Sequence, residues 1–146
     1  MYKKCALMLF STAGALALST TAAMASWRPY GNTNPITSGW KCGTTGQVTT
    51  DGKVLGQVCT VRNADRRFVT GAVIVRNNNS YLYTTSAGMT VYFSNGNQKG
   101  RWTCSSSGVA ANSWSVCFGT TFEANGDSYY TYGSANNVLL PRSATN

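Results

Sequence analysis

The cysteines of this chain constrain its fold more than any other feature. Cys5 lies in an N-terminal leader, and the other four are spread along the rest of the sequence: Cys42, Cys59, Cys104 and Cys117. An even number of cysteines in an exported chain predicts disulfides, and four cysteines allow three pairings. We expect Cys42–Cys59 and Cys104–Cys117, because each pair brackets one hairpin-like segment. Closing loops of this size stabilises a fold by roughly 3 kcal/mol per bond in the chain-entropy model.

The expectation of export rests on residues 1–25, which have the three parts of a cleavable signal peptide. Two early lysines give a positive start, residues 6–18 are almost entirely apolar, and Ala23-Met24-Ala25 supplies the small residues that a signal peptidase needs. The apolar run is too short for the roughly 20 residues that span a bilayer. We expect cleavage near Ala25 and no transmembrane segment in the mature chain. Residues 26–146 would then form one secreted domain, extracellular or periplasmic.

A zinc site is the main alternative role for the four cysteines, and the sequence argues against it. The chain has no Cys-x-x-Cys spacing and no histidine, and an oxidising compartment keeps thiols paired. The missing histidine also excludes a Ser-His-Asp triad and a Cys-His pair. We therefore expect no metal, no cofactor and no catalytic residue.

Only four carboxylates remain as candidate acids or bases: Asp51, Asp65, Glu123 and Asp127. The first belongs to a turn with Gly52, and the second to the charged segment Asn63–Arg67. Glu123 and Asp127 flank a turn at Gly126. As a pair, these two carboxylates would suit a glycosidase. Together with Asn125 they could bind calcium, but the spacing of a calcium-binding loop is incomplete. We interpret all four as turn or loop residues.

Short strand patterns recur every eight to twelve residues or so, with turn residues between them. The predicted strands are Val48–Thr50, Val54–Val61, Phe68–Arg76, Tyr81–Thr85, Met89–Phe93, Gly100–Ser105, Ser113–Thr121, Tyr129–Tyr132 and Asn137–Leu140. Asp51-Gly52 is a strong two-residue hairpin signal, and no helical repeat follows the leader. The sequence predicts an all-β, single-domain antiparallel β-sandwich, or a small closed barrel, of about eight strands with two disulfides.

Alternation along the predicted strands assigns side chains to faces, because successive residues point to opposite sides. Tyr130 and Tyr132 share a face opposite Tyr129, and Tyr81 and Tyr83 share a face. In Ser113–Thr121 we expect the core to be formed by one set of large apolar side chains: Trp114, Val116 and Phe118.

Two groups of residues are candidates for a ligand-binding surface. Planar aromatic rings on a rigid β face suit stacking against sugars. From a wider set that includes Tyr92 and Tyr129, the candidates are Tyr81, Tyr83, Tyr130 and Tyr132. Arginine forks suit carboxylate, sulfate or phosphate, and the candidates are Arg62, Arg66 and Arg67. The competing interpretation is that the tyrosines pack in the core and the arginines occupy a solvated loop.

Removing the leader leaves ten basic and four acidic residues, a net charge of +6. Such a charge attracts anionic surfaces, but nucleic-acid binding requires a denser basic patch and a recognisable module, and is not expected. We expect a non-enzymatic binding domain for a carbohydrate or a cell-envelope polymer. The alternatives are an inhibitor or antagonist of an extracellular hydrolase, acting through Asn63–Arg67, and a cationic antimicrobial or membrane-active protein.

Export should yield a protein that begins at Ser26 and has no free thiol. The intact mass of the purified, non-reduced protein should equal that of residues 26–146 less the hydrogen atoms lost in two disulfides. An uncleaved leader, or four cysteines that react with an alkylating reagent without prior reduction, would contradict this prediction.

Overall fold

The computed structural model describes residues 25–146, and all regular structure in this range is β-strand. The predicted leader, with Cys5, lies outside the described residues apart from Ala25. No helix able to cross a membrane occurs within the described range. The strands are β1 (Ser26–Gly31), β2 (Trp40–Cys42), β3 (Gly46–Gln47), β4 (Val54–Arg62), β5 (Phe68–Asn77), β6 (Tyr83–Phe93), β7 (Gln98–Val109), β8 (Ser113–Phe118), β9 (Phe122–Glu123), β10 (Tyr129–Ala135) and β11 (Val138–Leu140).

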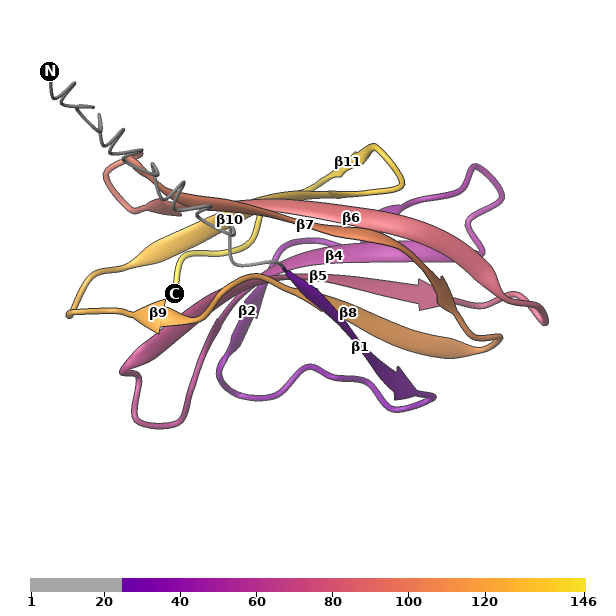
Figure 1. The fold of residues 1–146 in the computed structure, drawn as a ribbon, viewed down its shortest axis with the longest axis horizontal. Coiled ribbons are helices and arrows are strands. Elements are labelled where there is room, and N and C mark those ends of the chain that lie inside the picture. Colours follow the sequence, from indigo (N-terminus) through magenta and orange to yellow (C-terminus); the bar gives the residue numbers. More distant parts are fainter. Residues whose placement is uncertain (1–24) are drawn as a thin grey trace, which may run out of the picture.

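The strands form two antiparallel sheets packed face to face (Figure 1). One has seven strands in the order β1-β8-β5-β4-β2, with β3 paired to β4 and β9 to β5. The other has four strands in the order β11-β10-β6-β7. This confirms the predicted all-β antiparallel sandwich. The strand count exceeds the expected eight or so mainly because β2, β3 and β9, with two or three residues each, are too short to give a recognisable pattern.

The core between the sheets is built from the inward positions of each strand. Val58 of β4 pairs with Val73 of β5, and both are fully buried in one cluster with Met89 of β6 and Ala135 of β10. The two sheets approach closely at Gly133. A Cβ there would lie 2.9 Å from Val73 Cγ2 and 3.0 Å from Val58 Cγ2. Small residues on β10 therefore set how near the sheets can come.

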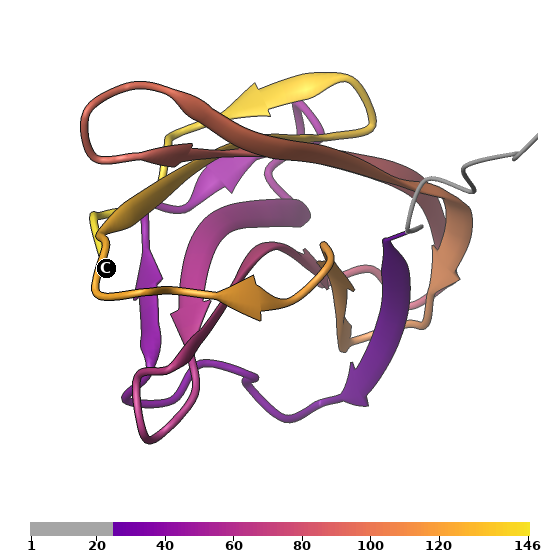
Figure 2. The ribbon, with the colours of Figure 1, turned by 60° about the vertical axis from the view of Figure 1, so that its left-hand side comes forward.

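The seven-stranded sheet is also partly covered on its outer side, where a second core cluster contains the β8 residues expected in the core. Trp114 and Phe118 of β8 do not face the other sheet but pack with Val116 in a second cluster on the outer side. Figure 2 shows the segment between β1 and β2 passing across that side, and its Ile36 joins the cluster. The inward positions of β8 instead hold Ser115 and Cys117, both buried. Alternation separated the faces correctly but did not show which one met the other sheet.

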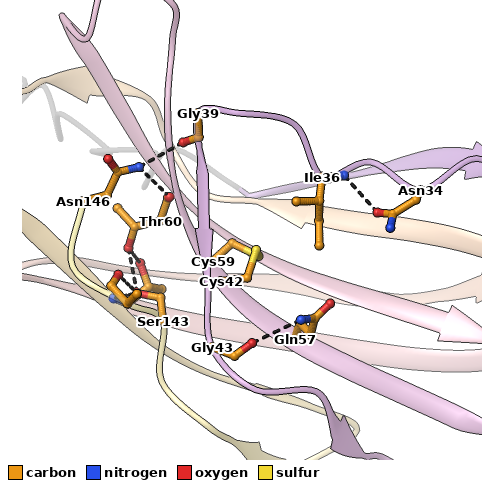
Figure 3. The surroundings of a disulfide bond; sticks show 12 residues. Asn34, Ile36, Gly39, Cys42, Gly43, Gln57, Cys59, Thr60, Ser143 and Asn146 are labelled. Carbon is orange, nitrogen blue, oxygen red and sulfur yellow. Dashed lines mark hydrogen bonds between the residues drawn. A yellow bond between two sulfur atoms is a disulfide. The ribbon is translucent and has the colours of Figure 1, made fainter.

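Both predicted disulfides are present. Cys42 and Cys59 are directly opposed residues of β2 and β4, with Cα atoms 4.0 Å apart (Figure 3). Cys104 of β7 and Cys117 of β8 belong to different sheets, and their Cα atoms are 6.1 Å apart. The second bond therefore ties the two sheets together, whereas the sequence suggested that it closes a hairpin.

A buried polar network joins the sheets near the C-terminal end of the chain. The hydroxyl of Thr60 in β4 lies 2.7 Å from that of Thr131 in β10 and 2.9 Å from that of Ser143. Close by, the side-chain amide of Asn146 donates to the carbonyl oxygens of Gly39 (2.9 Å) and Thr60 (3.0 Å) (Figure 3). The side chains of Thr60, Thr131, Ser143 and Asn146 are buried, and pairing them avoids the desolvation cost of an unpaired polar group.

Strand boundaries differ from the predictions where local signals were misleading. The predicted strand Tyr81–Thr85, from Tyr83 onward, and the predicted strand Met89–Phe93 belong to one strand, β6, because a register shift between Thr85 and Ala87 absorbs the small residues between them. The segment Val48–Thr50 is not a strand but part of the loop that contains Asp51. The four strands β1, β2, β3 and β9 were not predicted.

The Asp51 carboxylate has a structural role in this loop. Its Oδ1 accepts hydrogen bonds from the Thr49 hydroxyl (2.6 Å) and from the Lys53 amide (2.9 Å). The bond from Thr49 is the main cause that lowers the pKa of Asp51 from its usual value. The loop interpretation of this residue therefore agrees with the structure, although the turn is longer than two residues.

Gly133→Ala should destabilise the fold, whereas Gly88→Ala should not. The added methyl group at Gly133 would meet Val73 and Val58 between the sheets, and overpacking of this kind costs about 1–3 kcal/mol. Gly88 is the matched control, since it lies in the neighbouring strand but its Cβ would meet nothing nearer than Thr103 Cγ2 at 3.6 Å. Urea unfolding measures both. Equal effects of the two substitutions would contradict the assignment of inner and outer faces.

Candidate functional site

The outer side of the four-stranded sheet presents side chains to solvent. On β10 the buried residues Tyr129, Thr131 and Gly133 alternate with positions that point away from the core. The register places the outward residues of β10 beside those of β6 in three pairs: Tyr130–Tyr92, Tyr132–Thr90 and Ser134–Gly88. We call this surface the outer face.

Three tyrosines form a cluster on the outer face. The rings of Tyr92 and Tyr130 stack at 5.4 Å with an interplanar angle of 13°. Tyr132 meets both rings edge-on, at 5.7 Å from Tyr92 and 5.8 Å from Tyr130. The guanidinium of Arg142 lies 4.6 Å from the centroid of the Tyr130 ring. We call Tyr92, Tyr130 and Tyr132 the tyrosine cluster, and Tyr132 is its most accessible member at 43% exposure.

A groove of about 300 Å³ adjoins the cluster at Tyr132. Its lining includes Gly88, Thr90, Arg101, Tyr132, Ser134 and Leu139. The volume is at the small end of the range for ligand sites. The groove is hollow because Gly88 has no side chain between the short side chains of Ser134 and Thr103.

The outer face has a distinctive charge. The four strands of this sheet contain no aspartate or glutamate, and their charged residues are Lys99 and Arg101 of β7. The ammonium group of Lys99 lies over the rings of Phe93 and Phe122, on the side of the other sheet. The cations of the outer face are thus Arg101 and Arg142, which follows β11 and lies over Tyr130. The surface therefore offers aromatic rings, hydroxyl groups and cations, and its strands offer no carboxylate for acid–base chemistry.

The structure separates the four predicted tyrosines into different places. Tyr130 and Tyr132 share the outer face opposite buried Tyr129, as alternation predicted. Tyr83 instead packs against the inter-sheet core, and its hydroxyl accepts a hydrogen bond from Asn136 Nδ2 at 2.9 Å. Tyr81 precedes β6 and is 62% exposed, well away from the cluster.

Tyr92 belongs to the cluster but was not among the selected candidates. Its place beside Tyr130 depends on the pairing of β6 with β10, strands that lie far apart in the chain. Recognising β6 as one continuous strand would have put Tyr92 on the same side as Thr90, but the pairing itself leaves no local signal in the sequence.

Arg62 has a structural role that the sequence analysis did not foresee. Only 7% exposed, it donates hydrogen bonds from its guanidinium to the carbonyl oxygens of Arg66 (3.1 Å), Asn146 (2.9 Å) and Asp127. Burial is the main cause that lowers the pKa of Arg62, and the nearby charge of Arg66 adds to it. Arg62 ends β4 on the inward side and holds three chain segments together, so it is not part of an exposed arginine loop.

Arg66 and Arg67 do lie in an exposed loop. Arg66 adopts a positive φ of 62° in a turn closed by its amide and the carbonyl oxygen of Asn63 at 2.9 Å. The guanidinium of Arg67 lies 3.2 Å from Glu123 Oε1 in a solvent-exposed ion pair. A hollow of about 370 Å³ beside this loop is lined partly by Arg62 and Arg66.

Two of the candidate carboxylates are engaged by the same arginine. Glu123 is engaged by Arg67, and the Asp65 carboxylate accepts a hydrogen bond from the Arg67 amide at 2.9 Å. Among residues 25–146 no group of three or more potential metal-ligating side chains comes together.

Comparison with known proteins gives little beyond this geometry. No protein-family model matches the chain, and no curated protein is significantly similar to it. One solved structure with some similarity to this chain is Bacteroides uniformis beta-glucuronidase 2 covalently bound to cyclophellitol-6-carboxylate aziridine, with 14% identity over 73% of this chain and a TM-score of 0.39. A calcium-binding mutant of that enzyme has the same identity and a TM-score of 0.37. The chain spans 12% of either protein, and neither similarity is close enough to indicate what it binds.

Arg62→Met should cost about 2–3 kcal/mol of stability, because it removes the hydrogen bonds of a buried guanidinium to three chain segments. The matched control is Arg66→Met, an exposed arginine in the adjoining loop, which should change stability by less than about 0.5 kcal/mol. Urea unfolding of the two variants provides the measurement. If both variants unfold like the parent protein, the guanidinium of Arg62 does not hold the three segments together.

Proposed function

We propose that this chain is a non-enzymatic carbohydrate-binding domain and that it binds a polysaccharide across the tyrosine cluster and the adjoining groove. The observation that carries the proposal is the cluster itself: three tyrosines ordered against one another on an open sheet face. The apolar face of a sugar ring stacks on such rings, while its hydroxyl groups require hydrogen-bonding partners at the edge. Thr90, Ser134 and Arg101 line the groove and supply those partners.

The rigidity of the outer face supports the proposal. Seven consecutive residue pairs join β6 to β10. The tyrosine cluster stands on two of them, Tyr130–Tyr92 and Tyr132–Thr90, and the ring of Tyr92 also contacts that of Tyr132. Side chains held by their neighbours lose little entropy when a ligand binds, and this leaves more of the contact energy for affinity. An extended strip of paired strands also suits an extended polymer better than a compact small molecule.

The absence of carboxylates from the strands of the outer face favours binding over hydrolysis as the activity. Glycoside hydrolysis uses two carboxyl groups placed about 5–10 Å apart across the scissile bond. The side chains that line the groove include none. The two disulfides are compatible with an extracellular or periplasmic location, where a polysaccharide ligand would be met.

Tyr132→Ala and Tyr92→Ala should each weaken polysaccharide binding about tenfold, because a lost aromatic contact is worth on the order of 1 kcal/mol or more. Tyr81→Ala is the matched control, since it removes an exposed tyrosine that lies outside the cluster. Pull-down on a panel of insoluble polysaccharides identifies a ligand, and affinity electrophoresis in gels that contain its soluble form then ranks the variants.

Thermal unfolding should show that the three variants remain folded, since all three side chains lie at the surface. The proposal fails if the parent protein is retained by none of the polysaccharides. It also fails if Tyr132→Ala binds as tightly as Tyr81→Ala.

A further inference from the structure

Arg101 and Tyr132 lie in one row across the four-stranded sheet. Thr90 of β6 pairs with Arg101 of β7 on one side and with Tyr132 of β10 on the other. Neighbouring strands lie about 4.8 Å apart, so the backbones of Arg101 and Tyr132 are separated by roughly 10 Å. A sugar ring stacked on Tyr132 would have its edge over Thr90, within reach of a long arginine side chain.

The charge of Arg101 has no carboxylate partner within the described part of the chain. The ion pair found among residues 25–146 joins Arg67 to Glu123, on the other sheet. Asp51 belongs to a loop of that sheet, as does Asp65. Asp127 lies in the loop between β9 and β10, and no ion pair joins it to Arg101. Arg101 is exposed and lines the groove, so its guanidinium is free to bind an anionic group of a ligand.

We propose, on the basis of the function proposed above, that the ligand is an acidic polysaccharide whose sugars carry ring carboxylates. Arg101 binds the carboxylate of a sugar that stacks on Tyr132, and Arg142 lies over Tyr130 beside the next part of the polymer. A planar guanidinium matches a carboxylate through two parallel hydrogen bonds. The carboxylate of a hexuronic acid is attached directly to the ring, so it lies at the edge of the sugar. Arg101 lies beside that edge, because it occupies the same row as Thr90 and Tyr132.

The surrounding charge favours the same class of ligand. The strands of the outer face contribute Arg101 and no acidic residue, and the charges of Arg101 and Arg142 attract an anionic polymer but not a neutral one. Charge complementarity of this kind gives specificity and also speeds association. Salt screens exposed charges, so binding that depends on them should weaken at high salt.

The test compares polygalacturonate with its fully methyl-esterified form, which has the same backbone without the negative charge. The parent protein should bind the acid form at least tenfold more tightly. Arg101→Gln should lose about tenfold in affinity for the acid form, as expected for a charged hydrogen bond, and little for the ester. Arg28→Gln is the matched control, because it makes the same charge change on an exposed residue of β1 in the other sheet.

Three outcomes would overturn the inference. Equal loss for Arg101→Gln and Arg28→Gln would show a general charge effect rather than a site. Equal affinity for the acid and ester forms would show that the carboxylate is not recognised. Tighter binding of dextran sulfate than of polygalacturonate would show a preference for sulfate or for charge density. In each case the loss caused by Tyr132→Ala still tests the proposed function separately, because it does not depend on the charge of the polymer.

Discussion

The two sheets come closest at glycines, and the rest of the structure depends on that contact. A Cβ at Gly71 would lie 2.7 Å from Val91 Cγ2, and one at Gly133 would lie 2.9 Å from Val73 Cγ2. Because the inner layer has no spare room, the inward positions of β5, β6 and β10 are restricted to glycine, alanine, threonine and compact apolar residues, apart from the ends of the strands. Tyr83 and Tyr129 face inward at the ends of β6 and β10, and the larger polar side chains between those ends lie on the outer face. The tyrosine cluster is thus a consequence of close sheet packing combined with strand alternation.

The remaining surfaces of the sandwich are largely committed to holding it together. Cys104–Cys117 links the two sheets, and the hydroxyl groups of Thr60 and Thr131 link them again. The outer side of the seven-stranded sheet is covered by the segment that contains Ile36 (Figure 2). The outer face of the four-stranded sheet presents the tyrosine cluster beside an open groove, and our functional proposal is confined to it.

The sequence predicted the features that depend on local pattern and missed those that depend on long-range pairing. Cysteine count and spacing gave both disulfides, and alternation correctly placed Tyr130 and Tyr132 opposite Tyr129. The contact of Tyr130 with Tyr92 depends on pairing between distant strands. The burial of Arg62 was missed for the same reason. Its guanidinium binds three carbonyl groups that only the fold brings together, so in the sequence Arg62 looked like an ordinary charged residue of a loop.

An NMR titration with an oligosaccharide of the polymer that the protein binds most tightly would test the central claim directly. Our account predicts that the amide signals of Gly88, Thr90 and Tyr132 shift as ligand is added, while those of the outer side of the seven-stranded sheet stay in place. Shifts confined to the loop Asn63–Arg67, with Thr90 and Tyr132 unchanged, would contradict it and would place recognition on the opposite side of the molecule.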